Sequence, residues 1–430
     1  MPETAGGLCL LFLLVAPFAG AGLSLMNTGL ARSRSAAHTM LMAVSVGAVA
    51  VLAFFVCGFA WAGLAGAPSH AVRLAGKGWD WIGAGGFFLR GVNLSASRDS
   101  LTVLMQLESV ALCAMIPAAT VAERWRLGAC CASTAVLAGW TYPLFAHWVW
   151  GGGWLAQMGV TYHLGRGFVD PGGASCIHVV GGLTALSLAW IVGPRHAKFS
   201  AHGMPTAMPG HNAVIVLFGC VLALVGFLGL NSAGALLFGG VDAGQMVVVE
   251  VNTLLCAAAA AIGALLTTRV RFGRPDASLT ANGWVSGLVA SSAIVPFVRP
   301  AEAVLVGLIA GALVIFAVET IELRMKVDDP AGAIAVHSLG GMWGIVALGM
   351  FGRFGQTGTS SDGQFLAQLI GVATLLGFGL PLSYSVNWAI NRIVPQRVAM
   401  EGERQGMDLF ELGAGAYPEF VTHREDFLRR

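Results

Sequence analysis

Eleven apolar stretches, each long enough to cross a lipid bilayer, constrain this chain more than any other feature. A transmembrane helix needs about 20 mostly apolar residues to cross a hydrocarbon core about 30 Å thick. The chain is 56% hydrophobic and 11% charged, whereas about 25% of the residues in a soluble domain are charged. The sequence therefore predicts an all-α polytopic membrane protein. The expected spans cover residues 6–30, 37–64, 101–121, 128–150, 173–193, 213–236, 245–268, 280–298, 301–321, 333–352 and 365–394.

Basic residues between the expected spans predict the orientation. If the N-terminus lies outside, 17 of the 24 Lys and Arg residues fall on the cytoplasmic side and seven on the other side. Cytoplasmic loops of membrane proteins carry an excess of Lys and Arg. We therefore expect eleven transmembrane helices in an N-out/C-in arrangement.

One thirteen-residue pattern occurs twice in the chain. Residues 170–182 and 329–341 both read D-P-x-G-A-x-x-[IV]-H-x-x-G-G, so each copy places a histidine eight residues after an aspartate. Aspartate is a preferred N-cap residue, and proline suits the first helical position because no backbone donor is needed there. We expect Asp170 and Asp329 to cap two helices, with His178 and His337 about 12 Å along them.

The two copies are expected to enter the bilayer from opposite faces. In the N-out arrangement the first copy opens the fifth span and the second opens the tenth, and because five is odd the second repeat is inverted. Inverted repeats with a substrate site near the midplane are a recurrent transporter design. The predicted membrane domain, residues 1–395, contains two inverted five-helix repeats at about 6–193 and 213–352, and an eleventh helix at about 365–394. Residues 396–430 form a cytoplasmic tail without a span, free to contact a soluble partner.

His178 and His337 are the candidate pore residues. Ionisable groups inside spans are costly and usually line a pathway. A lone histidine there would more often be a hydrogen-bonded core residue, but the duplicated context favours a functional pair. Two neutral imidazoles side by side can share one proton and offer a donor and an acceptor to a small solute. The sequence offers no further ligands for a metal or other cofactor at matching depth, and no nucleophile–base set that would indicate an enzyme.

Trp150 and Asp170 are candidates for the outer mouth of such a pore. Trp150 lies where the fourth span reaches the outer surface. It is either an interfacial belt tryptophan or one wall of a cation–π site. Asp170 is a helix cap in the first place, and its charge could also favour an incoming cation.

Short motifs spread along the chain carry a family resemblance. They are Gly29-Leu30-Ala31-Arg32, Ala122-Glu123-Arg124, His147-Trp148-Val149-Trp150-Gly151-Gly152-Gly153, Gly193-Pro194-Arg195, Pro209-Gly210-His211-Asn212, Gly229-Leu230-Asn231, Val251-Asn252-Thr253 and Val327-Asp328-Asp329-Pro330. With these motifs the chain resembles the ammonium transporter/methylammonium permease/Rhesus (Amt/Rh) family over nearly its whole length.

The resemblance implies a homotrimer of eleven-helix subunits in the cell membrane, each with its own narrow apolar pore. His178 and His337 match the twin pore histidines of the family, Trp150 its outer recruitment tryptophan and Asp170 its structural aspartate. The tail around residues 406–409 resembles the regulatory C-terminus of the family. A PII-type signalling protein is the partner that this resemblance implies.

Several positions depart from the family pattern. Ser109 and Leu230 stand where two stacked phenylalanines usually close the pore, and Gly234 stands where a serine usually helps to hold the recruited cation. The signature Asp-Phe-Ala-Gly-Gly is altered in residues 170–174. Glu108, beside Ser109, is unexpected. It is a replacement cation receptor, a proton acceptor, or a carboxyl group near the outer boundary that is paired or solvated.

The predicted function is the transport of ammonium. Ammonium and potassium ions are similar in size, but ammonium can give up a proton, and neutral ammonia crosses an apolar pore far more cheaply than an ion. We expect ammonium to bind outside, to lose its proton, and to pass as ammonia beside His178 and His337; methylammonium is a further expected substrate. The alternatives are an ammonium sensor or slow-conducting regulatory homologue, and a pore for another small solute. The net charge of +2 gives no indication of a nucleic-acid partner.

Overall fold

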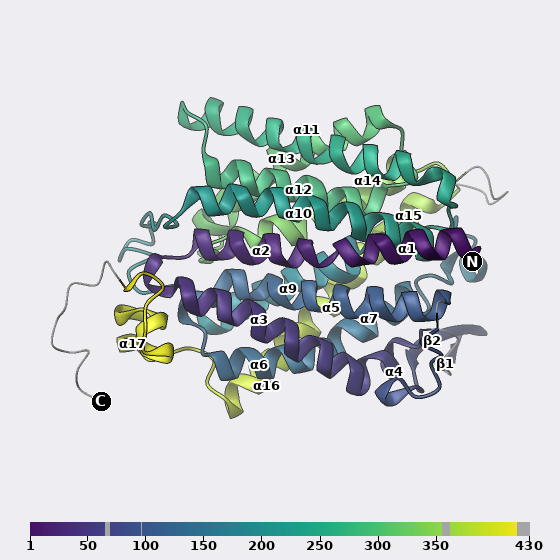
Figure 1. Ribbon diagram of the computed structural model, residues 1–430, viewed down its shortest axis with the longest axis horizontal. Helices are drawn as coiled ribbons and strands as arrows, with labels where there is room; N and C mark the ends of the chain where they lie inside the picture. The colour runs from purple at the N-terminus through teal and green to yellow at the C-terminus, as the bar shows by residue number, and fades with distance from the viewer. Residues whose placement is uncertain (65–68, 96, 355–361, 419–430) are drawn as a thin grey trace.

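Long helices run side by side along one axis in the computed structural model (Figure 1), which describes residues 1–64, 69–95, 97–354 and 362–418. Polar residues begin several of these helices by accepting hydrogen bonds from the first turn. Asn212 accepts from the Ile215 amide at 3.0 Å, and Asp276 accepts from the Leu279 amide at 2.8 Å. The helices are α1 (Glu3–Val15), α2 (Pro17–Leu30), α3 (Ala36–Ala53), α4 (Phe59–Ala62), α5 (Arg98–Val121), α6 (Leu127–Val136), α7 (Tyr142–Val149), α8 (Met158–Tyr162), α9 (Val180–Val192), α10 (Ala213–Gly234), α11 (Met246–Phe272), α12 (Ala277–Ile294), α13 (Pro300–Leu323), α14 (Gly340–Phe351), α15 (Gln364–Thr374), α16 (Leu380–Ile393) and α17 (Met400–Gln405).

The prediction of an all-α polytopic membrane fold is confirmed. Within the described residues, ten helical stretches are long and apolar enough to cross a membrane. The predicted span at 280–298 corresponds to α12, which packs among these stretches but is less apolar, since Asn282, Ser286, Ser291 and Ser292 are buried along it. A helix enclosed by other helices can carry such groups because protein, and not lipid, surrounds them.

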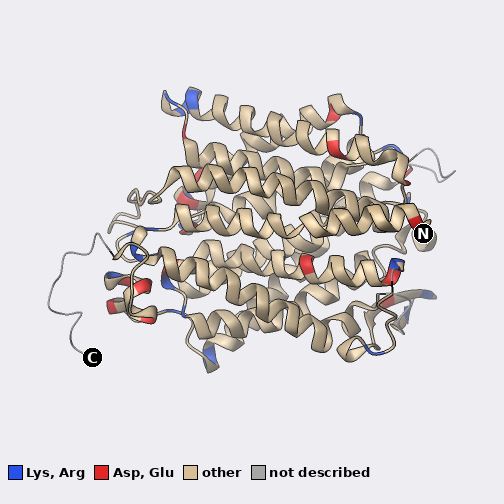
Figure 2. Ribbon diagram, viewed as in Figure 1, with Lys and Arg blue, Asp and Glu red and all other residues tan. Residues whose placement is uncertain are grey.

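The two ends of the bundle differ in character. One end carries the strands β1 (Ser69–Leu74) and β2 (Lys77–Gly83), and we call it the hairpin end; the other carries α17, and we call it the tail end (Figure 1). Lys, Arg, Asp and Glu gather almost entirely at these two ends, and the middle of the bundle is nearly free of them (Figure 2). This distribution is what a bilayer around the middle of the bundle requires.

The two copies of the repeated pattern enter the bundle at opposite ends of α5. The Asp329 carboxylate accepts a hydrogen bond from Thr120, in the last turn of α5, at 2.9 Å. Pro171, next to Asp170, instead lies beside Met105 in the first half of α5, since both surround Gly234. The two copies therefore start at opposite ends of the bundle.

The glycine pairs that end the two copies pack each copy against the other. A Cβ atom on Gly182 would lie 2.3 Å from the Ser338 hydroxyl oxygen, and one on Gly341 would lie 2.7 Å from the Ala174 carbonyl oxygen. Any side chain at either position would push the two helix starts apart. This reciprocal contact lets the two histidine-bearing turns meet.

The helical stretch that begins at the first copy is the most enclosed of the ten. Of the most apolar window in Ala174–Val192, 89% is buried, against 22% in Gln364–Ile393. The latter stretch, α15 with α16, lies on the outside of the bundle.

Two segments outside the spans differ from what the sequence indicates. The long loop expected between the second and third spans contains the β1–β2 hairpin, and Asp80 on β2 lies 3.1 Å from the His147 Nε2 atom. The tail expected to be free packs against the tail end in residues 396–418. Asp408 there accepts from the amides of Ala37 and His38 at 3.1 and 2.7 Å, which caps the start of α3. The rest of the predicted tail, residues 419–430, lies outside the described residues.

Candidate functional site: a stacked histidine pair

His178 and His337 lie edge to edge inside the bundle, with their Nδ1 atoms turned toward each other. Their Nδ1 atoms are 3.1 Å apart, their ring centroids 5.1 Å apart, and their planes are inclined by 18°. His178 is fully buried and His337 is 4% exposed. The Nδ1 distance fits a hydrogen bond in which one ring donates and the other accepts, so the neutral pair shares one proton between the two nitrogens.

The pair leaves one buried nitrogen without a partner. His178 Nε2 makes no hydrogen bond to any of the residues that the structure describes. A buried polar atom without a partner is costly unless something else satisfies it. A small solute with a hydrogen to donate or a lone pair to offer would fill this role.

Both histidines lie in π-helical turns at the start of their helices. His178 belongs to the turn Ala174–Val179, which leads into α9, and His337 belongs to Ile334–Leu339, which leads into α14. Such turns are rare and recur at functional sites because they change the direction in which side chains point. The repeated pattern therefore produces the same local geometry twice.

Phe227, on α10, stacks on the opposite side of the pair and was missed by the sequence analysis. Its ring centroid lies 5.2 Å from that of His178, and the two planes are inclined by only 9°. The only signal available was its position three residues before Leu230, which puts both on one face of a helix. Phe227 thus covers one face of the His178 ring, while His337 meets that ring at its Nδ1 edge.

Asp170 caps the first copy more completely than expected. Its two carboxylate oxygens accept from the amides of Gly173, Ala174 and Ser175 at 2.9, 2.8 and 2.7 Å, and also from the Ser175 hydroxyl. The prediction that Pro171 is the first helical residue is wrong. The helix begins at Ala174, and the Asp170 carboxylate reaches across the turn between them. With its carboxylate engaged and only 3% of the residue exposed, Asp170 can act on a cation only through space.

Trp150 is joined to this cap and covered by a second missed aromatic ring. Its Nε1 atom donates to the Asp170 carbonyl oxygen at 2.7 Å. Phe238 stacks on Trp150 with ring centroids 4.8 Å apart and planes inclined by 12°. A cation could therefore reach this indole face only by displacing Phe238.

The three substituted pore positions all lie inside the protein. Ser109 and Leu230 are buried, at 0% and 1% exposed. At Gly234 a Cβ atom would lie 2.2 Å from the Pro171 carbonyl oxygen. A serine cannot fit there while Pro171 keeps its position, so the changes at positions 171 and 234 are physically coupled.

Glu108 does not face the histidines. On α5 the face that carries Cys113 and Ile116 packs against Gly181, next to the histidine turn. Glu108 lies instead on the face with Ala111 and Met115, which lines a separate cavity. This placement disfavours the hypothesis that Glu108 replaces the missing serine and phenylalanine at the outer mouth.

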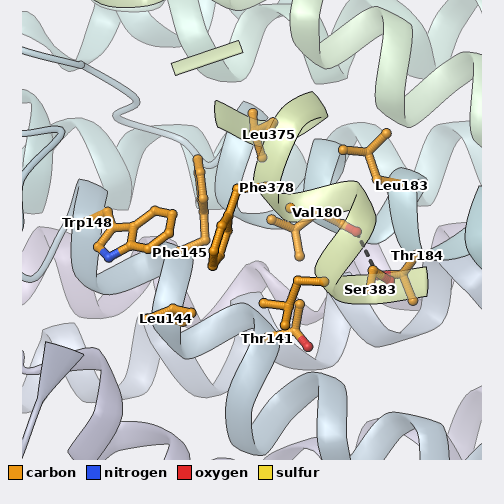
Figure 3. Close-up of a pocket in the computed structure, with 12 residues that line it drawn as sticks. Thr141, Leu144, Phe145, Trp148, Val180, Leu183, Thr184, Leu375, Phe378 and Ser383 are labelled. Atoms are coloured by element: carbon orange, nitrogen blue, oxygen red, sulfur yellow. Dashed lines mark hydrogen bonds between the residues drawn. The ribbon is translucent and has the colours of Figure 1, made fainter. Parts of the chain in front are cut away.

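A groove between α7, α9 and α16 is also separate from the pair (Figure 3). Phe378 lies against Phe145 and Trp148 there, and Ser383 donates to Thr184 at 3.0 Å. Neither histidine lines this groove. Across the described residues, no group of three or more His, Cys, Asp or Glu side chains is placed to hold a metal ion.

Comparison with known proteins finds relatives over almost the whole chain. The profile of the Ammonium Transporter Family matches residues 8–417. This chain belongs to the ammonium transporter family. The ammonium transporter Amt2 of Archaeoglobus fulgidus is 33% identical over 419 residues, which cover 94% of this chain and 86% of that protein. The ammonium transporter of Bacillus subtilis is 28% identical, covering 93% of this chain and 94% of its own length.

Solved structures give the same fold. A protein described as a sensor Amt protein superimposes with a TM-score of 0.84 at 27% identity, covering 96% of this chain and 100% of its own. Mep2 of Candida albicans superimposes with a TM-score of 0.80 at 22% identity, covering 98% of this chain and 91% of its own. This ammonium transporter family member is therefore a multi-pass membrane protein of a transporter family and not an enzyme.

A buried ion network holds the second copy of the pattern in this ammonium transporter family member. Asp328 accepts from the Arg195 side chain through both oxygens, at 2.9 and 3.0 Å, and lies 3.6 Å from the Arg124 guanidinium. Glu123 joins Arg195 to Arg32 in the same cluster. Burial alone would raise the pKa of Asp328, but the two arginines lower it to about 2.

Proposed function

We propose that this protein carries ammonium across the cell membrane, binding it at the outer mouth near Trp150, removing its proton and passing ammonia beside His178 and His337. The observation that carries the proposal is the buried imidazole pair with one shared hydrogen bond and an unpartnered Nε2 atom. In this proposal the hairpin end faces the outside, and the subunits assemble as a homotrimer.

The chemistry of the pair favours a neutral solute. An isolated charge in an apolar interior carries a large desolvation cost, whereas ammonia needs only a few hydrogen bonds to replace those of water. The pair supplies an acceptor and a donor without holding a net charge of its own. Phe227 closes one side, so the solute meets the imidazole edges, and the protons released outside can be handed along the shared hydrogen bond.

The outer mouth closes differently from the family pattern in this proposal. Phe238, stacked on Trp150, closes the pore in place of the two phenylalanines that Ser109 and Leu230 replace. Ammonium enters when Phe238 swings away and exposes the indole face, where a cation–π contact contributes about 0.5–2 kcal/mol. Phe238→Ala is then expected to speed methylammonium entry and to weaken selectivity against potassium.

Uptake into proteoliposomes tests the proposal. Ammonium, methylammonium and potassium are compared for the wild type, His178→Ala, His337→Ala and the double variant. Ammonium and methylammonium uptake should fall at least tenfold in each variant, while His202→Ala, which changes an exposed histidine, should behave as wild type. Unaltered uptake in a folded double variant would remove the proposal.

A sensor is the second candidate function. Two observations favour it: the likeness to a sensor Amt protein, and the tail packed on the start of α3 through Asp408. A sensor would change the exposure of residues 396–418 when ammonium binds, and a PII-type signalling protein would read that change at the tail end. Slow flux, together with ammonium-dependent proteolysis of the tail or ammonium-dependent capture of a PII-type protein, would favour the sensor over the transporter.

A further inference from the structure

A cavity separate from the histidine pair opens on the side of the bundle. It lies where α1 and α2 meet at a break, beside α3 and in front of α5, helices that run next to one another in Figure 1. Its volume is about 180 Å³, which is room for several waters at roughly 30 Å³ each or for a short alkyl chain. Its walls are formed by Ala16, Pro17, Gly20, Val51, Leu107, Glu108, Ala111, Leu112, Met115 and Leu230.

The mouth of the cavity faces the apolar side of the protein. Leu14, Phe18 and Leu52, which are close in sequence to the lining residues Ala16, Pro17 and Val51, are 63%, 43% and 62% exposed. Exposed leucine and phenylalanine along the middle of a membrane bundle contact lipid. A ligand would therefore reach the cavity from within the membrane, and not through either aqueous end.

Glu108 is the one ionisable residue among those that line the cavity. Its Oε2 atom is buried and has no hydrogen-bond partner in the part of the chain that the structure describes. No lysine, arginine or histidine lines the walls. Because a buried carboxylate without a partner is costly, the cavity is electrostatically incomplete as it stands.

The chemistry of the walls selects the kind of partner. A hydrated inorganic cation needs several oxygen ligands, and the walls offer one carboxyl group among alkyl side chains. An alkylammonium ion suits both parts, because its head donates to a carboxylate while its chain buries apolar surface at about 25 cal/mol per Å². The cavity therefore suits a ligand that has one small cationic head group and a short apolar chain.

We propose that this cavity is a binding site for a primary alkylammonium ion that enters from the membrane and pairs with Glu108. Leu230 forms its inner wall, one helical turn from Phe227, which stacks on His178. A ligand in this cavity would therefore contact α10, the helix whose Phe227 stacks on His178. The proposal concerns a second site and does not depend on whether the histidine pair conducts.

Calorimetric titration of the purified full-length protein in detergent tests the proposal, with hexylammonium chloride as the probe and hexan-1-ol as its uncharged counterpart. The wild type should bind hexylammonium at least tenfold more tightly than hexanol. Glu108→Gln should remove that preference. The matched control is Glu250→Gln, a carboxyl group in another span that already accepts from Ser232 at 2.7 Å, and it should leave the preference unchanged.

Two further variants keep the result interpretable. Ala111→Leu fills the cavity without touching the carboxyl group and should abolish binding of both probes. The double variant His178→Ala/His337→Ala should bind hexylammonium as the wild type does, which separates this site from the proposed pore. Equal binding of hexylammonium by the wild type and Glu108→Gln would overturn the proposal. So would dissociation of the oligomer by Glu108→Gln on size exclusion without any amine binding, since a second copy of the chain would then be the partner of this face.

Discussion

The two copies of the repeated pattern hold their histidines alike but are anchored in different ways. Asp170 is satisfied by its own turn, through the four successive amides of residues 173–176 and the Ser175 hydroxyl. Asp329 accepts from one amide of its own copy, Ile334 at 2.8 Å, and from Thr120 on α5 at 2.9 Å. The first start is therefore secured locally, and the second by other helices.

The difference shows that two copies of a sequence can hold their histidines in the same geometry while their aspartates have different hydrogen-bond partners. At the hairpin end the hydrogen bonds of Asp170 stay within its own turn. Because Gly234 has no side chain, α10 can approach this turn closely. At the tail end the residue before the aspartate, Asp328, supplies the anchor by pairing with Arg195 and Arg124. Substitutions in the two copies should therefore have unequal effects.

The largest expected effect comes from breaking the tail-end anchor. Asp328→Asn removes the counter-charge of the buried Arg124 and leaves Arg195 paired with Glu123 alone. Removing one partner of a buried ion pair costs about 3–5 kcal/mol. Thermal unfolding in detergent should show a large loss. Asp276→Asn, which changes an exposed helix cap, should lose far less; similar losses in the two variants would contradict the anchoring role.

The next effect separates the two aspartates. Asp170→Asn replaces one acceptor oxygen by a donor and leaves buried amides unsatisfied, at a cost of about 3 kcal/mol. Asp329→Asn can still accept from Ile334 and donate to Thr120, so we expect a loss below about 1 kcal/mol at pH 7. The same unfolding measurement compares them, and equal losses would show that the two caps are equivalent after all.

A smaller effect depends on pH. Burial raises the pKa of Asp329 from the ordinary 3.8 to about 6. The folded protein therefore holds an extra proton between these values, and this contribution to stability is lost as the pH rises from about 4 to 6. Because the side chain is partly exposed, we expect about 2 kcal/mol over that window. The pH dependence of unfolding should be flatter in Asp329→Asn by that amount, and identical curves would refute the assignment.

The smallest effect concerns the tail. Glu411 lies 2.8 Å from His38 Nε2 and accepts from the Leu127 amide at 3.1 Å. Burial opposes ionisation, but these contacts lower the pKa of Glu411 overall, so its contribution is present above about pH 4.5 and is lost in more acidic solution. Glu411→Gln should cost about 1 kcal/mol and speed proteolysis of residues 396–418. Unchanged proteolysis would show that Asp408 and the other contacts of the tail hold it without Glu411.

Hydropathy and the repeated pattern were sufficient to predict the helical membrane fold and the entry of the two copies from opposite ends. Both depend on regularities that a single sequence displays directly: the length of apolar runs, the sign of loop charges and a thirteen-residue spacing. The contact between His178 and His337 follows from the same symmetry. Ring partners such as Phe227 do not, because stacking depends on the rotation of α10 about its own axis.

Glu108 illustrates the limit most clearly. It is adjacent to Ser109 in sequence, which suggested a shared place in the pore. Neighbouring residues on a helix point about 100° apart at 3.6 residues per turn, so one faces the α9 side and the other the lateral cavity. Only the register of α5 against its neighbours decides between them. The docking of Asp408 and Glu411 depends likewise on contacts more than 280 residues away in the chain.

The reciprocal glycine contact couples the packing of the two copies of the pattern. Because Gly182 abuts Ser338 while Gly341 abuts Ala174, an added methyl group at either glycine wedges open the same seam. Once one wedge is in place, the second finds the seam already parted, so a double-mutant cycle of Gly182→Ala and Gly341→Ala should be strongly non-additive. The shape of one copy at this contact therefore constrains the shape of the other. A tolerated substitution at one of these contact positions should require a compensating substitution in the other copy.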